Sequence, residues 1–268
     1  MNTFNQIIND HLKYRKQIFK LAKSDINKTY RGAALGWAWA IIKPIMTIAV
    51  YWFAFSVGIR KGNPIDGVPF FLWMLPGIVP WFYMSEMLTQ GTECIRSNRH
   101  LVTKMRFPVS TIPTFVSLSK LAVNLGLMLI MTIIVICGGQ PITIYYLQLP
   151  IYILLMFMFF TALTMFTSLL GAVSKDFVNL VKAFVTPIFW LSGILYPVSE
   201  INNVWLRRIL MANPITYLCT GFRNVYLYQK WIWEDWKPML VFLCVLLVMI
   251  LISGCMYKKI RKDLPDVL

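Results

Sequence analysis

Six long apolar runs, each bounded by charged residues, constrain the fold of this chain more than any other feature. A helix needs about 20 mostly apolar residues to cross a hydrocarbon layer roughly 30 Å thick. The runs meet this length, and they cover approximately residues 33–59, 69–90, 110–137, 148–173, 181–198 and 238–257. We therefore expect an all-α integral membrane protein with six transmembrane helices, folded as a single domain over residues 1–268.

The composition agrees with a multi-span membrane protein. Hydrophobic residues make up 58% of the chain and charged residues only 14%, whereas about a quarter of a soluble domain is charged. A chain this apolar is not intrinsically disordered. Five cysteines without a C-x-x-C pair do not predict a disulfide scaffold, and two histidines are too few for a histidine-based metal site, so we expect no metal.

The first 32 residues lack a continuous apolar core, so we do not expect a cleavable signal peptide. Apolar side chains recur near helical spacing with bases on the other face, which is typical of an amphipathic helix in the headgroup plane. A soluble arm folded on a partner is the alternative. The apolar residues are Phe4, Ile8, Leu12, Phe19, Ala22 and Ile26, and the bases are Lys13, Arg15, Lys16, Lys20, Lys23, Lys28 and Arg31.

The distribution of Lys and Arg predicts the orientation. If the N-terminus lies inside, most of the 26 Lys and Arg residues fall in the inner segments 1–32, 91–109 and 174–182 and in the C-terminal tail. The positive-inside rule then places both termini in the cytoplasm. The formal charge of +15 is explained by topology and lipid contact. No RNA-binding motif or recognition helix accompanies it, so we expect no nucleic-acid partner.

Two connections between the predicted spans stand out. Residues 94–108 hold four bases around a central Leu-Val pair, which predicts a short amphipathic helix across the cytoplasmic mouth. Residues 193–236 are too polar to span and too apolar for an ordinary loop, and Pro197 and Pro214 divide them into short pieces. We expect re-entrant or interfacial helices there, on the outer face between the fifth and sixth spans.

The motifs of the common hydrolytic reactions are absent from the sequence. There is no G-x-x-x-x-G-K-[ST] loop, whose backbone amides and lysine hold nucleotide phosphates, so this chain is not an ATPase. H-E-x-x-H and G-x-S-x-G are missing too, and the 11 acidic residues are scattered. We therefore do not expect the chain to be an enzyme by itself.

Ionisable residues inside the predicted spans are the best local indications of function. Lys43, Glu86 and Lys120 each lie within an apolar run, where a charge is costly unless it faces a cavity or a partner. Lys43 and Glu86 both fall in the inner half of their spans and are candidates for a buried pair; the alternative is that each snorkels or meets a backbone carbonyl. Aromatic side chains gather along the first two spans, either as an interfacial belt or as the lining of a route for a bulky amphiphile.

Four strings along the chain resemble one family. They are Tyr30-Arg31-Gly32 with Leu35, Gly36, Trp39 and Pro44, the run YWFAFSVGIRKGNPIDGVPFFLWMLPGIVPWF at 51–82, TQGTECIRSNRHLVTKMRFPVSTIPT at 89–114, and NPITYLCTGFRNVYL at 213–227. The sequence resembles the permease subunits of type 2 ABC exporters that move polysaccharides, and within them the wall teichoic acid exporters. The opening Gly and Trp pattern also occurs in O-antigen and capsule exporters.

The resemblance implies an assembly. Two copies of this chain would dock on two cytoplasmic ABC ATPase subunits in a bacterial plasma membrane, and the ATPases would bind ATP and Mg. The cargo would be a teichoic acid polymer on a polyprenyl diphosphate lipid. The partners of the permease would then include this lipid-linked polymer and the lipids of the membrane. The segment 94–108 would be the coupling helix, with contacts to the ATPase from Asn98, Arg99, Lys104, Met105, Phe107, Pro108 and, in a second loop, Asp176.

The resemblance also implies a route for the cargo. The basic residues Lys23, Lys28 and Arg31 are candidates for meeting the diphosphate at a lateral entrance. Arg207, Arg208 and Arg223 are candidates for contacts with a phosphate-rich polymer near the exit, although headgroup contacts explain them as well. The candidates along the path are Trp39, Lys43, Trp52, Trp81, Tyr83 and Glu86.

Several alternatives remain open on the sequence. The same architecture serves O-antigen or capsule polysaccharide export, or the export of a small drug, although the string at 51–82 argues against a drug. A membrane enzyme acting on polyprenyl-linked sugars would require a cluster of acids or metal ligands at the membrane surface. An ion-coupled transporter should show acids or internal repeats through its spans, and Glu86 alone is thin support.

Overall fold

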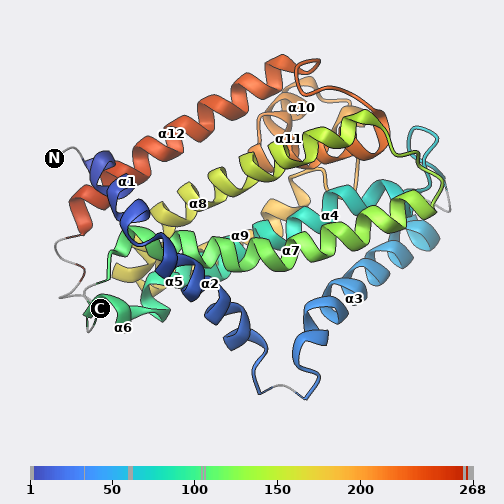
Figure 1. Cartoon of the computed structure of the whole chain (residues 1–268). Coiled ribbons are helices and arrows are strands. Elements are labelled where there is room, and N and C mark those ends of the chain that lie inside the picture. Colours follow the sequence, from blue (N-terminus) through green and yellow to red (C-terminus); the bar gives the residue numbers. More distant parts are fainter. Residues whose placement is uncertain are drawn as a thin grey trace.

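The described part of the chain is helical. The structure is a computed structural model that describes residues 3–32, 34–59, 63–103, 105, 107–261 and 264. Four long helices lie against one another and form most of the body seen in Figure 1; they are α4 (Phe70–Glu86), α7 (Ile112–Cys137), α8 (Leu149–Val173) and α12 (Trp236–Ile260). Among the described residues, the extended backbone forms one isolated bridge, between Ile65 and Val68.

The body has two ends that differ in content. One end, called here the arm end, holds α1 (Thr3–Lys13), α5 (Thr92–Ser97), α6 (Arg99–Thr103) and the last turn of α12 (Figure 1). The opposite end, the loop end, holds the connections 63–69, 138–143 and 229–235 (Figure 1).

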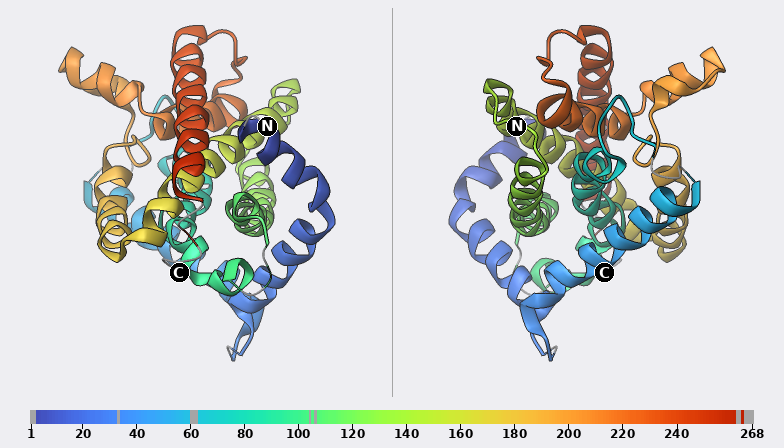
Figure 2. Two further views of the ribbon diagram at one scale, coloured as in Figure 1. Left: turned by 90° about the vertical axis from the view of Figure 1, so that its left-hand side faces the viewer. Right: turned by 90° about the vertical axis from the view of Figure 1, so that its right-hand side faces the viewer.

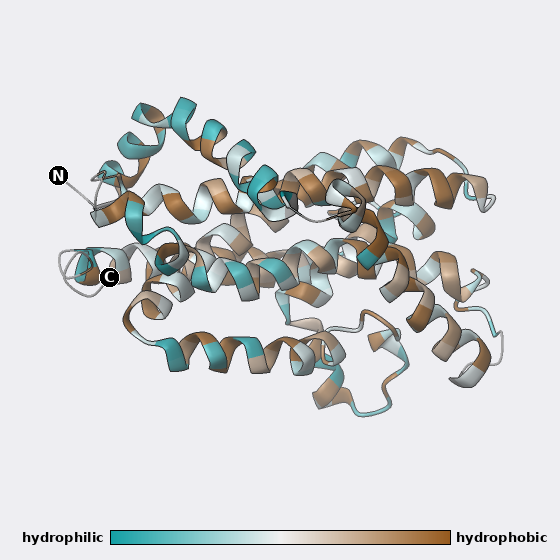
Figure 3. Cartoon of the chain, turned by 90° about the horizontal axis from the view of Figure 1, so that it is seen from below, coloured by the Kyte–Doolittle hydropathy of each residue, from teal (hydrophilic) through white to brown (hydrophobic). Residues whose placement is uncertain are grey.

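Four helical stretches are long and apolar enough to cross a membrane. They are Gly36–Gly58, Val109–Cys137, Ile144–Val173 and Trp236–Ile260. Large apolar side chains point away from the protein along them, including Val50, Leu129, Leu154 and Leu247. Because water would penalise so much exposed apolar surface, these faces suit lipid. The prediction of an all-helical membrane protein is confirmed at this level; Figure 3 shows brown, apolar stretches along most of the helices.

The second and fifth predicted spans form shorter helices. In place of the run 69–90, α4 has 17 residues, contains Pro76 and Pro80, and passes through a π-helical turn, Met87–Gly91, into α5. Thirteen of its 17 residues are buried, so α4 is enclosed by protein rather than by lipid. The run 181–198 matches a helix only over residues 181–190, because α9 extends over Lys175–Trp190. The first half of α9 is polar, so the apolar run that predicted the span begins inside the helix. The apolar residues after Trp190, which belong to that run, form a turn.

The N-terminal arm, defined as α1 and α2 (Arg15–Tyr30), packs on the body instead of standing apart from it. The chain bends at Tyr14, and Ile18 and Ala22 are buried with residues of α5 to α8 and α12. Three side-chain hydrogen bonds hold the arm near α7: His11 Nε2 with Thr114 Oγ1 at 2.7 Å, Ser110 Oγ to Asp10 Oδ2 at 3.2 Å, and Ser119 Oγ to Asp25 Oδ2 at 2.7 Å.

The outer face of the arm remains amphipathic. Ile8, Leu12 and Phe19 are exposed there among the bases of the arm. Figure 2 shows the arm as an arc around the outside of the helices. The single helix predicted for residues 1–32 is therefore two helices joined at a bend, with one face on protein and an exposed face that suits a headgroup layer.

The segment 193–236 divides into short helices. Asn203 caps α10 (Val204–Met211) and Asn213 caps α11 (Pro214–Arg223), where each side-chain oxygen accepts a backbone N–H of the first turn. Pro214 is the first residue of α11, a position where its missing N–H costs nothing. A π-helical turn, η7 (Asn224–Tyr228), follows. Helix α11 is buried against α4, whereas α10 projects outward in Figure 2.

Candidate functional site

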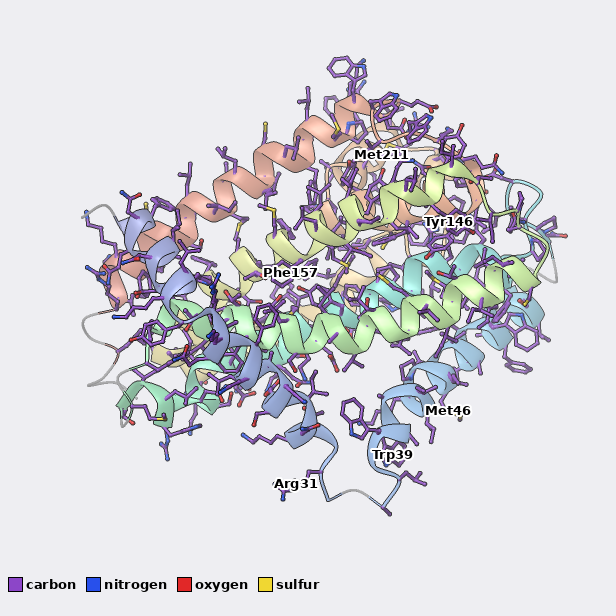
Figure 4. The ribbon with its side chains drawn as sticks, in the orientation of Figure 1. Arg31, Trp39, Met46, Tyr146, Phe157 and Met211 are labelled. Atoms are coloured by element: carbon purple, nitrogen blue, oxygen red, sulfur yellow. The ribbon has the colours of Figure 1, made fainter. Side chains whose placement is uncertain are left out.

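Helix α3 (Trp39–Phe53) stands away from the body at the start of the first span. Gly32 and Gly36 have φ values of 86° and 49°, which residues with side chains rarely adopt, and they turn the chain from α2 toward α3. No residue within α3 is buried. Figure 4 places Arg31 and Trp39 on the two sides of this turn, where α2 and α3 diverge.

A cavity of about 250 Å³, called here the lateral cavity, lies between the end of α2, α3, α4 and α7. Because four helices contribute to it, residues distant in sequence meet there. Its polar and charged lining residues are Thr29, Lys43, Thr47, Tyr83, Ser85, Glu86, Gln90, Lys120 and Asn124.

The charges of the lateral cavity come from three helices. Lys120 of α7 is only 5% exposed, Glu86 of α4 is half-buried, and Lys43 of α3 is exposed. Of the two alternatives for Lys43 and Glu86, the structure shows no ion pair within 4.0 Å between them, although both line the cavity; the Lys43 ammonium lies 5.9 Å from the centre of the Trp39 ring. Two lysines against one carboxylate give the cavity a net positive charge.

Asn124 adds an incomplete polar group to the lateral cavity. Its Nδ2 donates to the Val79 carbonyl at 2.8 Å, while its buried Oδ1 has no hydrogen-bond partner among the described residues. A buried acceptor without a partner is costly, which suggests that a ligand or water fills this place. Asn124 was not among the predicted site residues. The spacing of Lys120, Val123, Asn124 and Leu127, all of which line the cavity, was the available signal, since these positions share one helical face.

The predicted path residues divide into two groups. Trp39, Lys43, Tyr83 and Glu86 line the lateral cavity. Tyr83 is nevertheless largely a core residue, because its ring is buried and its hydroxyl hydrogen bonds to Ser117 Oγ at 2.7 Å.

Trp81 and Trp52 lie outside the lining of the lateral cavity. Trp81 is buried, with its ring centre 5.4 Å from that of Phe189 in α9. Trp52 is exposed and meets Phe71 edge-on. The structure therefore does not gather all six predicted path residues at one surface.

The predicted entrance residues are all exposed. Lys23 and Lys28 lie on α2, and Arg31 follows its last turn. Thr29, next to Lys28, lines the lateral cavity. Lys28 is therefore the sequence neighbour of a residue that lines the lateral cavity.

The predicted coupling segment consists of two helices, α5 and α6, and not one. Asn98 separates them, and its Nδ2 donates to the Cys94 carbonyl at 2.9 Å, so this side chain closes the end of α5. Arg99 is exposed at the start of α6. The break gives the segment a corner rather than a continuous amphipathic face.

The remaining predicted coupling residues follow α6 or begin α9. Met105 is exposed, Pro108 is half-buried, and Phe107 packs edge-on against Tyr14 of the arm, with ring centres 5.4 Å apart. Lys104 lies outside the described residues. Asp176 is exposed in the first turn of α9, and the ion pair of Lys182 with Glu93 at 2.8 Å connects α9 to α5.

The bases predicted near the exit differ in availability. Arg207 and Arg208 are on α10, where the Arg208 guanidinium lies over the Trp205 ring. Arg223 is buried: its three nitrogens donate to the carbonyls of Trp73, Gly193 and Ile194, and its guanidinium lies 3.5 Å from the centre of the Trp73 ring. Each of its three side-chain nitrogens therefore already donates to a backbone carbonyl, and contact of Arg223 with a polymer stays a prediction. Among the residues that the structure describes, no group of three or more His, Cys, Asp or Glu side chains is arranged to hold a metal.

The family model of the ABC-2 type transporters matches residues 16–227. These residues include the whole lateral cavity and α5 to α11. The chain belongs to the ABC-2 type transporter family. Among its relatives, the O-antigen export system permease protein RfbA of Myxococcus xanthus is 25% identical over 262 residues, covering 97% of this chain and 98% of the relative. This ABC-2 chain therefore matches a permease protein along almost its entire length.

Two further relatives of the ABC-2 chain are more distant. The O-antigen export system permease protein RfbA of Klebsiella pneumoniae is 21% identical over 208 residues, covering 77% of this chain and 78% of the relative. The polysialic acid transport protein KpsM of Escherichia coli is 22% identical over 187 residues, covering 69% and 70%. These names describe proteins of polysaccharide transport.

Proposed function

We propose that this chain is the transmembrane permease subunit of an ATP-driven exporter, which moves a polysaccharide linked to a polyprenyl diphosphate lipid across the membrane. The names of its relatives support the polysaccharide class. The observation that carries the proposal is the lateral cavity, where Lys43 and Lys120 meet a single carboxylate, Glu86, beside a helix without buried residues.

The cavity chemistry suits the diphosphate. An anionic headgroup cannot enter hydrocarbon without losing its hydration, so a transporter must supply compensating charge and hydrogen bonds. Lys43 and Lys120 supply them, with Lys28 at the end of the arm and Arg31 directly after it. Because α3 faces lipid on its outer side, the polyprenyl tail can remain in the bilayer while the headgroup enters between α3 and α7.

The proposal includes an orientation and an assembly. Both termini and the arm end face the cytoplasm of a bacterium, and α3, α4, α7, α8, α9 and α12 provide six spans in the plasma membrane. Two copies associate with two ATPase subunits, which bind ATP and Mg, while this chain itself has no cofactor. The coupling surface consists of Arg99, Met105, Phe107, Asp176 and their neighbours at the arm end. The polymer then passes between the first and fifth spans of the two copies.

The cargo has two candidates within the polysaccharide class. A teichoic acid polymer rests on the resemblance of the strings at 51–82 and 89–114. The relatives are named for O-antigen and for polysialic acid, which supports an O-antigen or capsule polymer at least as well. Family membership does not favour the membrane enzyme or the ion-coupled transporter.

The experiment that tests the function is purification of the tagged chain from detergent-solubilised membranes. We expect an ABC ATPase to co-purify, and its turnover to rise on addition of polyprenyl-diphosphate-linked polymer. The double variant Lys43→Met, Lys120→Met should weaken the apparent affinity for that polymer about tenfold or more, since charge-assisted hydrogen bonds to phosphate are lost.

The matched control is Lys237→Met, an exposed lysine at the start of α12 whose ammonium lies over the Trp236 ring. It should leave the stimulation unchanged. Absence of any ATPase in the purified complex would overturn the proposed function. An unchanged affinity in the double variant would remove the lateral cavity from the route. Stimulation by a glycerol- or ribitol-phosphate polymer would identify teichoic acid, and stimulation by a neutral glycan the other cargo.

The coupling surface predicts a different loss. Arg99→Glu reverses an exposed charge at the start of α6, so folding should be unaffected. We expect polymer-stimulated turnover of the ATPase to fall at least tenfold while the purified permease keeps its elution volume. Lys258→Glu, the same change on the last turns of α12, is the control. Full stimulation in Arg99→Glu would exclude α6 from the coupling surface.

A further inference from the structure

A second cavity lies at the loop end. It has a volume of about 530 Å³, in the range of small-molecule sites, and α11, η7, the residues after α9 and the start of α12 enclose it. We call it the loop-end cavity. Thr220 and Lys230 are exposed where they line it, so it communicates with the surroundings. Met211, labelled in Figure 4, marks its α10 side.

Two buried hydroxyl groups of the loop-end cavity have no partner. Thr216 is 4% exposed and Tyr217 is 7% exposed; Thr216 Oγ1 hydrogen bonds to no described residue, and the Tyr217 hydroxyl faces the Tyr152 hydroxyl without a hydrogen bond of ordinary geometry. The Tyr152 ring is close to Tyr217, with centres 6.2 Å apart, and also lines the cavity. Buried polar groups are nearly always hydrogen-bonded, so adjacent unpartnered hydroxyls in one cavity indicate a ligand that completes them.

The remaining polar groups of the cavity describe the ligand further. Arg223 is the most buried cation in its wall, and each of its three side-chain nitrogens already donates to a backbone carbonyl. Asp66 accepts from the Tyr228 hydroxyl at 2.7 Å and Asp235 accepts from Asn224 Nδ2 at 3.2 Å, which leaves carboxylate oxygens at the wall.

The wall carries two carboxylates, Asp66 and Asp235, and two cations, Lys230 and Arg223, so it has no net positive charge to attract a phosphate. The hydroxyl groups of a sugar can donate to the carboxylates. Aromatic rings and hydroxyl acceptors and donors on the same wall match the apolar face and polar edge of a sugar ring. Tyr228, half-buried beside Asp66, and Tyr217 provide the rings.

We propose that the loop-end cavity binds a neutral sugar unit of the exported polymer as it leaves the membrane. The proposal rests on the proposed export function and makes it more specific, because it assigns to the loop end a site for the sugar and to the lateral cavity the site for the diphosphate. The site contacts the sugar through Thr216 and Tyr217, whose hydroxyls the fold leaves unbonded.

The test measures binding of small sugars to the detergent-purified full chain with its co-purifying partner. The probes are the methyl glycosides of glucose, galactose, rhamnose and N-acetylglucosamine, and binding is read by saturation-transfer NMR. At least one probe should bind to the wild type. Tyr217→Phe and Thr216→Val should each weaken that binding about five-fold, as expected for loss of one hydrogen bond, without lowering thermal stability, since no bond within the protein is lost.

The matched control is Tyr146→Phe. The Tyr146 hydroxyl is also buried without a partner, but it lies on η5 (Ile144–Gln148), outside the lining of the cavity; Figure 4 labels it at the same end. Its removal should not change sugar binding. Failure of all four probes to bind, or equal binding by wild type and the Tyr217→Phe, Thr216→Val double variant, would overturn this inference. Co-purification of the ATPase and its stimulation by polymer are read separately, so the proposed export function is judged independently of this result.

Discussion

Arg223→Met is expected to lower the free energy of unfolding by about 3 to 5 kcal/mol, because the carbonyls of Trp73, Gly193 and Ile194 would each lose a buried hydrogen bond to a cation. Burial lowers the pKa of Arg223 to about 10, which still leaves the guanidinium charged at neutral pH. The side chain therefore joins α4, α11 and the turn after α9 as one permanently charged connection.

The measurement is the fraction of detergent-solubilised protein that remains monodisperse after heating, read by size-exclusion chromatography. Arg223→Lys should recover only part of the loss, because an ammonium on a flexible stem does not reproduce three donors in a planar fork. Arg208→Met removes an exposed arginine over Trp205 and should melt like the wild type. Equal melting of Arg223→Met and Arg208→Met would show that the carbonyls find other partners.

Gly171→Ala is the second substitution with a large expected effect. A Cβ added at Gly171 of α8 would lie 2.5 Å from the Thr92 carbonyl oxygen of α5 and 3.0 Å from Val178 Cγ2 of α9. The first neighbour is backbone, so it cannot rotate away and α5 must shift. We expect a loss of about 1 to 3 kcal/mol, the usual cost of overpacking, and a drop in polymer-stimulated ATPase turnover because α5 precedes the coupling surface.

Gly126→Ala is the control for Gly171→Ala. It is also a glycine within a long helix, α7, but its added Cβ would meet nothing within 4 Å. Alanine is favoured over glycine in a helix by about 1 kcal/mol, so Gly126→Ala should be neutral or slightly stabilising. The heating assay compares the two directly. If both variants melt alike, the close approach of α8 and α5 does not limit stability.

The apolar runs predicted the positions of the membrane-length helices, because length and composition alone decide whether a helix suits a bilayer. Helices around Val50, Leu129, Leu154 and Leu247 expose apolar side chains, which is the property that a run of such residues records. The bounds of helix α9 could not be predicted in this way. Lys175, Asp176 and Lys182 are tolerated in its first half through the ion pair with Glu93 and an exposed first turn, which are features of the folded protein.

The site residues were less predictable than the helices. The cost of an intramembrane charge drew attention to Lys43, Glu86 and Lys120 one by one, and the structure places all three in the lining of the lateral cavity. Their pairing depended on the angle at which α3 leaves the body, and no local sequence pattern records that angle. Arg223 shows the same limit: its carbonyl partners come from α4 and from the turn after α9, about 150 and 30 positions away.

The exposed state of α3 has a mechanical consequence. Moving a typical helix out of a protein is expensive because its buried face must be transferred from protein to another medium. Helix α3 has no buried residue, and the two positive-φ glycines, Gly32 and Gly36, form a joint before it. Its apolar side chains can exchange their contacts with α4 and with Phe189 of α9 for lipid of similar polarity at little cost. Helix α3, which forms one wall of the lateral cavity, can therefore rotate about this joint while the core of α4, α7 and α8 stays fixed.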